Sequence, residues 1–255
     1  MKDAIVKALT EQAEARDCRI LLAVESGSRA WGFASPDSDY DIRAVYVKPL
    51  DWYLGIEEPM SGTWEAMLPG ELDVSAWDLR KTLRQLLKSN ASLLEWIGSP
   101  IVYADTGLLA TLAELAQRAF NPAHVAFHYA AMFRHALANR TADGTMSVKK
   151  LCYALRANAA VAWVRTRETM PPTEFVRVLE GIDLADDTRR AIDDLLRLKS
   201  GAAEKDRILP SAALTPLLVD HFEELSAIRW TRTNDPLDEV RMDCDNLFRS
   251  IAKQL

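Results

Sequence analysis

The fold of this chain is decided by one stretch near its start, Leu21-Leu-Ala-Val-Glu-Ser-Gly-Ser-Arg-Ala-Trp-Gly-Phe-Ala-Ser-Pro-Asp-Ser-Asp-Tyr-Asp-Ile-Arg-Ala-Val-Tyr-Val47. The apolar run from Ile20 to Val24 predicts a short buried strand. It stops at Ser26-Gly27-Ser28, where glycine frees the backbone and serine caps a following helix. That helix is brief, because Gly32 favours a helix end. The strand, turn and helix start are suited to aim backbone N–H groups at an anion such as a phosphate.

Acidic residues follow this turn and lead into a second predicted strand, Ile42–Val47. Because side chains alternate along a strand, Asp39 and Asp41 are expected to share one face. Neighbouring carboxylates repel each other unless a cation neutralises them, and hard oxygen ligands suit magnesium or manganese. A third acid, Asp73, lies in the alternating stretch Glu71–Trp77, which predicts a further strand facing the same site.

Three acids on adjacent strands, beside a turn that holds phosphates, predict two-metal nucleotidyl transfer. In this prediction Asp39 and Asp41 bind both metals, and Asp73 binds the catalytic metal and helps to deprotonate an acceptor hydroxyl. Gly27 and Ser28 hold the phosphates. Asp-x-Asp alone and Gly-Ser alone are common in ordinary turns, so the prediction depends on their ordered combination.

These residues carry a resemblance to a known family. Gly27-Ser28, Ser38-Asp-Tyr-Asp41 and Asp73 resemble the signature of the DNA polymerase β-like nucleotidyltransferase superfamily. A narrower resemblance, to the predicted nucleotidyltransferases associated with RNA ligases in bacterial RNA repair loci, covers most of the chain. It is carried by Glu25–Asp41, Asp73–Arg80, Ser89-Asn90, Leu94-Glu-Trp96 and Lys149–Arg156. The resemblance implies an NTP as substrate, Ser38 in the nucleotide site, and an RNA end or an RNA ligase as partner.

The resemblance also implies an α+β fold, with a small mixed β-sheet domain like the polymerase β palm before an all-α domain. The hydrophobic spacing agrees, because nearly every segment after Tyr103 is helical. We therefore expect a catalytic domain over 1–104 and a helical substrate- or nucleotide-binding domain over 105–255. The helices expected in the first are Lys2–Arg16 and two meeting at Ser89-Asn90, and those in the second are Thr106–Phe120, Pro122–Asn139, Ser147–Glu168, Pro172–Leu179, Asp186–Lys199, Thr215–Trp230 and Leu237–Lys253.

The helix Ser147–Glu168 carries a basic stripe. Lys149, Tyr153 and Arg156 lie at i, i+4 and i+7 on one face, with Lys150 beside them. Ammonium and guanidinium groups next to an aromatic ring suit a triphosphate and its base. The alternative is a solvated basic face, with Arg156 paired to a core acid and Tyr153 packed in the interior.

Other candidate residues have simpler interpretations. Arg29 follows the Gly-Ser turn, so it is predicted to reach a phosphate, with a surface salt bridge as the alternative. His124, His128 and His135 share a helical face. We interpret them as structural rather than as metal ligands, although His128 is also a candidate to line the cleft.

Composition excludes several classes of function. The net charge of −6 argues against a broadly basic surface that coats nucleic acid, but it is compatible with a local basic groove. Cys18, Cys152 and Cys244 have neither disulfide nor zinc spacing, so they are expected to be reduced. No apolar run approaches the length that spans a membrane, and Met1-Lys2-Asp3 opens an amphipathic helix. We expect a cytoplasmic protein without membrane contact.

The sequence therefore predicts a metal-dependent nucleotidyltransferase that moves an NMP from an NTP to an acceptor hydroxyl and releases pyrophosphate. Magnesium or manganese is the expected cofactor, and an RNA end is the acceptor that the resemblance favours. Two alternatives stay open. One is a protein or small-molecule nucleotidyltransferase of the antitoxin-like or aminoglycoside type. The other is a non-catalytic nucleotide- or RNA-binding partner of an RNA ligase.

Overall fold

The computed structural model describes residues 1–56, 62–201, 206–230 and 237–254. This part of the chain divides into two compact units. The sheet unit comprises 1–30, 39–120 and 234–255, and the helical unit comprises 31–38 and 121–233. The division differs from the boundary predicted at residues 104 and 105. Helix α6 (Leu108–Ala119) and the C-terminal helix α12 (Asp238–Ala252) belong with the sheet, whereas Trp31–Ser38 belongs with the helices.

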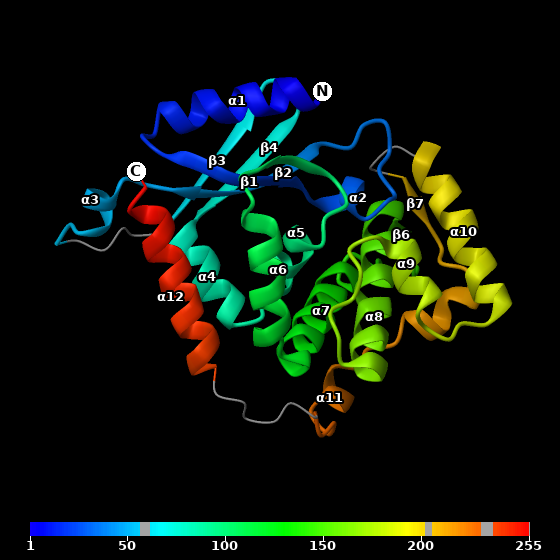
Figure 1. Cartoon of the computed structure of the whole chain (residues 1–255). Helices are drawn as coiled ribbons and strands as arrows, with labels where there is room; N and C mark the ends of the chain where they lie inside the picture. The colour runs from blue at the N-terminus through cyan, green and yellow to red at the C-terminus, as the bar shows by residue number, and fades with distance from the viewer. Residues whose placement is uncertain (57–61, 202–205, 231–236, 255) are drawn as a thin grey trace. The chain divides into compact units, whose positions relative to one another are not determined.

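The sheet unit is built on a mixed sheet that, within the described residues, has the strand order β3-β4-β2-β1-β5 (Figure 1). Strands β2 and β4 pair in parallel, and the other neighbours are antiparallel. The α+β fold expected from the sequence is confirmed. The strands are β1 (Arg19–Glu25), β2 (Tyr40–Val47), β3 (Thr63–Leu68), β4 (Leu72–Asp78) and β5 (Val102–Asp105). The short helix α3 (Leu50–Tyr53) follows β2, and residues 57–61 of the irregular stretch before β3 lie outside the described residues.

Helices cover both faces of this sheet. Helix α1 (Lys2–Glu14) packs Ile5 and Leu9 against one face, where they meet Ile42 and Val74 in a common core. Helices α4 (Leu79–Leu87), α5 (Ala91–Ile97) and α6 lie on the other side (Figure 1). Because Ile42 points towards α1, its neighbours Asp41 and Arg43 on the same strand point to the opposite face.

The predicted break between α4 and α5 is explained by local backbone chemistry. Ser89 has a φ of 51°, which an α-helix does not allow, and its hydroxyl donates to the carbonyl of Ala119. The side chain of Asn90 accepts from the N–H of Leu93 at 3.1 Å. Asn90 is therefore the N-cap of α5, and the two helices meet at this pair as the sequence predicted.

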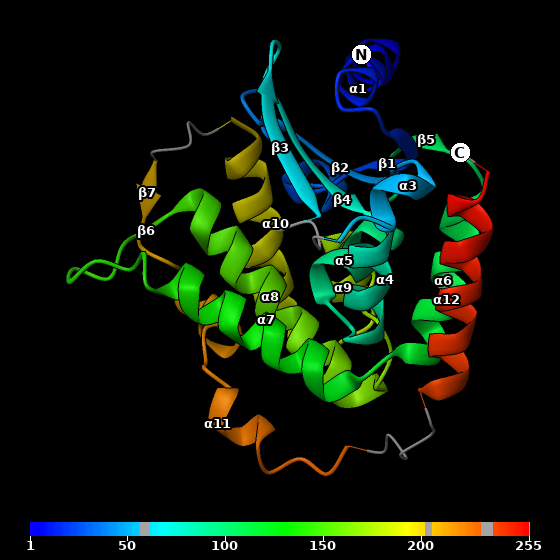
Figure 2. The same cartoon turned by 90° about the vertical axis from the view of Figure 1, so that its left-hand side faces the viewer.

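The helical unit is held together by α7 (Pro122–Leu137) and α8 (Val148–Arg167), which lie side by side in Figure 2. Phe133 of α7 and Leu155 of α8 share its hydrophobic core. The remaining elements are the strand pair β6 (Met146–Ser147) and β7 (Arg207–Ile208), α9 (Phe175–Glu180), α10 (Asp186–Gly201), the 3₁₀-helix η1 (Ala212–Leu217) and α11 (Phe222–Leu225).

The prediction of one continuous helix over Thr215–Trp230 is wrong. The structure has η1 and the short α11 in this region, separated by a non-helical segment. Pro216 lies inside η1, where it has no N–H to donate to a longer helix. Asp220 accepts from the N–H of Phe222 at 2.9 Å and from Arg134 at 2.6 Å, so its carboxylate stabilises a turn.

Two predictions about the whole chain can also be compared with the structure. Cys18, Cys152 and Cys244 are all described and none forms a disulfide, as their spacing predicted. Among the described helices, none combines the length and the apolar character needed to cross a membrane.

Candidate active site

Two of the three acids predicted to be catalytic, Asp41 and Asp73, meet at the edge of the sheet where β1 ends and β2 and β4 begin. Strand β1 ends at Glu25, and the antiparallel β2 begins at Tyr40 beside it. Strand β4 runs parallel to β2 with Asp41 opposite Asp73 in the register. Paired positions on neighbouring strands direct their side chains to the same face. The structure therefore brings Asp41 and Asp73 together on the sheet face that points away from α1.

Arg43 joins the two carboxylates. Its Nη2 lies 3.0 Å from Asp41 Oδ1 and 3.0 Å from Asp73 Oδ2. Its Nη1 donates to the main-chain carbonyls of Asp73 at 3.0 Å and Ile42 at 3.1 Å. One guanidinium thus offsets the repulsion between two carboxylates. Arg43 was not predicted as a site residue, although its position two residues after Asp41 on the same strand face was a signal that could have found it.

Gly27 supports Asp41 from the turn. The residue has a φ of 59°, and a Cβ placed on it would lie 1.9 Å from Asp41 Oδ2. A side chain at this position is excluded both by the left-handed backbone and by the carboxylate. The N–H of Ser26 also donates to the main-chain carbonyl of Asp41 at 2.8 Å. The glycine is therefore required because the carboxylate of Asp41 packs directly against the turn.

Glu25 is a further site residue that the sequence analysis did not assign. Its side chain is fully buried, and Oε1 accepts from the N–H of Asp41 at 2.7 Å while Oε2 accepts from the hydroxyl of Tyr103. Burial raises the pKa of this carboxyl above its usual value, and the Tyr103 hydrogen bond opposes that change. Glu25 fixes the start of β2 and hence the position of Asp41. An acid at the end of an apolar strand was the only signal for it.

Ser28 and Arg29, which follow Gly27, pack against or hydrogen-bond to neighbouring residues of the sheet unit. Helix α2 (Gly27–Ala30) contains the buried Ser28. Arg29 Nε donates to the main-chain carbonyl of Asp39 at 3.1 Å, and its guanidinium carbon lies 3.9 Å from the centre of the Tyr40 ring. Asp39 is exposed and lies one residue before β2, so the expectation that it shares a face with Asp41 stays a prediction. Strand pairing therefore does not align its side chain with that of Asp41.

Ser38 belongs to the helical unit and takes part in a turn there. Its hydroxyl accepts from the N–H of Ser35 at 2.9 Å and lies 3.1 Å from the Ser35 hydroxyl. Lys199, which is only 2% exposed, donates to the same Ser35 hydroxyl at 2.8 Å. Ser38 therefore holds the shape of the segment that follows the Gly-Ser turn.

The donor chemistry of the acid pair can be compared with the needs of a metal. In the part of the chain that the structure describes, no three His, Cys, Asp or Glu side chains are grouped to hold an ion. However, Asp41 Oδ1 and Asp73 Oδ2 flank one position, where the cationic Nη2 of Arg43 lies 3.0 Å from each. Two carboxylate oxygens around a site for positive charge fit magnesium or manganese, provided that Arg43 moves away.

Most of the predicted nucleotide-binding residues of α8 line a cavity of about 320 Å³. Three of the four, Lys150, Tyr153 and Arg156, line it, whereas Lys149 is not among the described lining residues. The cavity is completed by side chains that include Trp31, His128 and His135. Helical spacing therefore placed Tyr153 and Arg156 on one face of α8, and the α8 face that lines the cavity includes Lys150 rather than Lys149.

Arg156 is the buried cation of this cavity. It is 2% exposed, and its Nη2 donates to the carbonyl of Thr173 at 3.0 Å. Its guanidinium carbon lies 4.4 Å from the centre of the Trp31 ring and 6.0 Å from that of Tyr129. Tyr153 meets Trp31 edge to face at 4.9 Å. The alternative of a solvated basic face is therefore wrong for Arg156, whereas Tyr153 is half-buried, packs against the core and also lines the cavity.

Comparisons with known proteins agree with the motif. Residues 1–250 match the model of the RlaP family, described as the RNA repair pathway DNA polymerase beta family. The uncharacterized protein YcgL of Bacillus subtilis (strain 168) is 37% identical over 207 residues, which are 81% of this chain and 79% of that protein. A nucleotidyltransferase-like protein from Exiguobacterium sibiricum 255-15 is 16% identical, over 92% of this chain and 96% of that chain, with a TM-score of 0.30. A TM-score of this size supports no inference.

Proposed function

The chain belongs to the RNA repair pathway DNA polymerase beta family, and from this premise we propose that it transfers an NMP from an NTP to a hydroxyl at an RNA end and releases pyrophosphate. One observation carries the proposal. Asp41 and Asp73 lie together at the sheet edge, and Gly27 packs against Asp41 at the turn that precedes them. An acid pair beside a small-residue turn suits a triphosphate and the cations that accompany it.

We assign the metal site to Asp41 and Asp73, with Asp39 as the third carboxylate. A bound magnesium or manganese ion supplies Lewis-acid chemistry at the phosphoryl and attacking oxygens. Asp73 takes the proton of the acceptor hydroxyl, and the turn at Gly27 and Ser28 holds the phosphates. Arg43, once released from the carboxylates, has the charge and the planar donors to hold a phosphate.

We further assign the helical-unit cavity to the nucleotide. Its volume of about 320 Å³ lies within the usual range for small-molecule sites. Lys150 and Arg156 contribute positive charge, and Trp31 and Tyr153 contribute ring surface. Arg29, Ser38 and Lys149 stay predicted nucleotide contacts, because the contacts described for Arg29 and Ser38 are with the chain itself and Lys149 does not line the cavity.

One observation favours a second candidate function. Arg43 already forms ion pairs with both Asp41 and Asp73. A protein that only binds nucleotide or RNA and accompanies an RNA ligase would keep the acids in this closed arrangement. Such a protein would bind NTP without transferring a nucleotide, and it would tolerate the loss of Asp73.

The test is transfer of label from each α-³²P-NTP, with manganese or magnesium, to a mixed RNA pool and to a cell lysate. The native protein is compared with Asp73→Asn and with Glu65→Gln, an exposed acid on the neighbouring strand β3. Label on RNA that requires Asp73 but not Glu65 supports the proposal. Label on protein or on a small molecule overturns the RNA acceptor. NTP binding without transfer, unchanged in Asp73→Asn, establishes the second candidate.

A further inference from the structure

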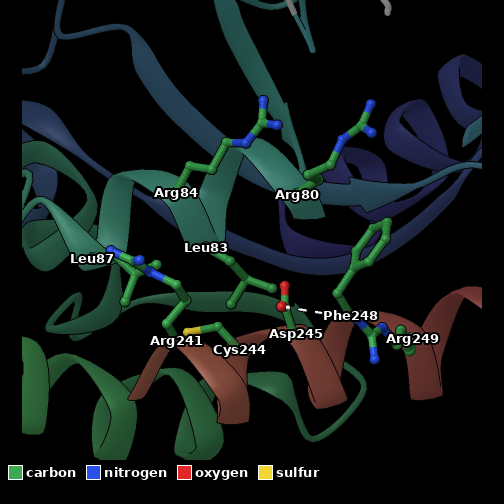
Figure 3. Close-up of a pocket in the computed structure, with 9 residues that line it drawn as sticks. All are labelled: Arg80, Leu83, Arg84, Leu87, Arg241, Cys244, Asp245, Phe248 and Arg249. Carbon is green, nitrogen blue, oxygen red and sulfur yellow. Dashed lines mark ion pairs between the residues drawn. The ribbon is translucent and has the colours of Figure 1, made fainter. Parts of the chain in front are cut away.

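A second cavity, of about 270 Å³, lies in the sheet unit between α4 and α12 (Figure 3). We call it the α4–α12 pocket. Among its described lining residues, Arg80 and Arg84 come from α4, and Arg241 and Arg249 come from α12, against the single acid Asp245. The whole chain carries a net charge of −6. Four arginines around one pocket therefore give this region a more positive charge than the chain as a whole. The pocket is therefore a local basic site on an acidic protein.

The arginines of α12 are only loosely engaged with acids. Arg249 lies 4.0 Å from Asp245, and Arg241 lies 3.9 Å from Asp238. These separations are too long for hydrogen bonds. By contrast, Asp243, which also belongs to α12, forms an ion pair at 2.7 Å with Arg118 of α6. The side chains of Arg241 and Arg249 are 62% and 66% exposed, so they can exchange their present partners for an anionic ligand.

Aromatic rings extend from the same pocket. Phe248, which lines it, meets Tyr53 edge to face at 4.9 Å, and Tyr53 meets Trp52 in the same way at 4.9 Å. Arg80 lies with its guanidinium carbon 5.2 Å from the centre of the Tyr53 ring, and the Lys48 ammonium lies 5.8 Å from that of Trp52. A row of three rings with cations over two of them is thus continuous with the basic pocket.

The pocket is connected directly to the proposed catalytic strand. Strand β4 carries Asp73 near its start and ends at Asp78, whose side chain caps α4 by accepting from the N–H of Arg80 at 2.9 Å. At about 3.3 Å per residue, this part of β4 spans roughly 17 Å. A polymer that has one end at the acids can therefore reach the pocket with residues close to that end.

We propose that the α4–α12 pocket binds single-stranded RNA. Arg80, Arg84, Arg241 and Arg249 hold its phosphates, because guanidinium groups pair with phosphate through parallel hydrogen bonds. The bases stack on the row of rings, as in other sites that bind single strands without sequence preference. The rings favour RNA over an acidic protein segment, which has carboxylates but no bases to stack. The inference relies on the proposed function only for RNA as the acceptor.

The experiment measures binding of a fluorescein-labelled, mixed-sequence 20-nucleotide RNA to the full chain by anisotropy, with EDTA and without NTP. The variants are Arg241→Gln/Arg249→Gln and Trp52→Leu. The control is Arg177→Gln/Arg197→Gln, which removes the same charge from arginines of the helical unit that are 67% and 77% exposed. Thermal unfolding of each variant shows whether it is folded.

We expect the Arg241→Gln/Arg249→Gln protein to bind RNA about tenfold more weakly, with the slope of log affinity against log salt reduced by about 1.4. Trp52→Leu should weaken binding about fivefold or more, with an unchanged salt slope. The control should stay within about twofold of the native protein. Equal RNA binding by the native, pocket and control proteins would overturn the inference.

Two further outcomes distinguish RNA binding at the pocket from general anion binding and from catalysis. If polyglutamate displaces RNA as well as an unlabelled RNA of equal charge does, the pocket is a general anion site and the RNA assignment is wrong. Because EDTA and the absence of NTP exclude transfer, RNA binding is scored independently of catalysis. A protein that binds RNA through the pocket but transfers no nucleotide would refute the proposed function and leave this inference intact.

Discussion

Arg43 in the sheet unit and Arg156 in the helical unit are both site arginines, but their charges are held in opposite ways. Arg43 lies on the central strand β2, with its side chain 18% exposed, and forms ion pairs with two carboxylates at 3.0 Å. Arg156 is buried, donates to the Thr173 carbonyl and faces the Trp31 ring at 4.4 Å. The comparison shows that strand pairing positions one site, whereas packing of distant segments positions the other.

The two arrangements fail differently when they are disturbed. At the sheet edge, the loss of Arg43 leaves two like charges side by side in contact with water. In the helical unit, the loss of Arg156 removes a buried donor from the Thr173 carbonyl, which costs free energy of unfolding. The sheet edge should therefore respond mainly in its affinity for cations, and the helical unit mainly in its stability. The predictions below test this difference, beginning with the largest expected effect.

The largest effect should come from Gly27→Ala, which places a methyl group against the Asp41 carboxylate. We expect the free energy of unfolding to fall by about 3 kcal/mol and nucleotide transfer to fall at least about 100-fold. Gly32→Ala is the matched control, because Gly32 also has a positive φ, 85°, but a Cβ there would meet no atom within 4 Å. It should cost about 1 kcal/mol. Equal losses in both variants would show that backbone strain, not Asp41, requires the glycine.

The next effect concerns the helical unit. Arg156→Met should lower the free energy of unfolding by about 2 kcal/mol in urea titration, because the Thr173 carbonyl loses a buried donor and the rings lose a cation. Arg167→Met is the control on the same helix. Arg167 also donates to a carbonyl, that of Gly181 at 2.9 Å, and lies 4.6 Å from the Trp163 ring, but it is exposed. A similar cost for both variants would contradict the role given to burial.

At the sheet edge, Arg43→Met should increase the affinity for manganese about tenfold, equivalent to about 1.4 kcal/mol, because the guanidinium no longer competes for Asp41 and Asp73. Isothermal titration calorimetry with manganese chloride, in the absence of NTP, measures this directly. Arg19→Met, an exposed arginine at the start of β1, should leave the affinity unchanged. Unchanged or weaker manganese binding by Arg43→Met would show that Arg43 does not occupy the metal position.

The smallest effect should appear at the other end of β4. Burial raises the pKa of Asp78 above its ordinary value of 3.8. A raised pKa stabilises the fold at low pH, and this contribution is lost as the pH rises through the folded-state pKa. Asp78→Asn removes the titration and keeps a good N-cap. Its stability relative to the native protein should therefore increase as the pH rises from about 4 towards neutrality. Urea unfolding across this range checks the sign, which a constant difference would contradict.

Local patterns predicted much of the sheet edge correctly. The apolar run before Glu25 formed β1, and the alternating segment that contains Asp73 formed β4. Alternation also indicated on which face Asp41 lies. The predicted strand Ile42–Val47 started two residues too late, because β2 begins at Tyr40, where pairing with β4 begins. Pairing is a tertiary property that no single strand contains.

The helical unit shows where local patterns end. Helical spacing found the α8 face that carries Tyr153 and Arg156, but it did not show that Arg156 is buried beside Trp31, which comes from a segment 125 residues earlier in the chain. Nor did it show that α12 returns to α4 and brings Arg241 and Arg249 to the same pocket as Arg80. Contacts between segments that are distant in the sequence produce no periodic pattern of side chains in either segment.

The sequence by itself determined the family, the order of strand, turn and acids, and the identity of the residues available for chemistry. These properties depend on neighbours within a few positions, so side-chain alternation, helical spacing and the freedom of glycine are enough to predict them. Only the tertiary structure decided that Arg43 closes the acid pair, that Arg156 is enclosed by rings, and that Trp31–Ser38 packs with the helical unit. Each of these depends on which distant segments meet, and that is settled by packing and strand register rather than by local preference.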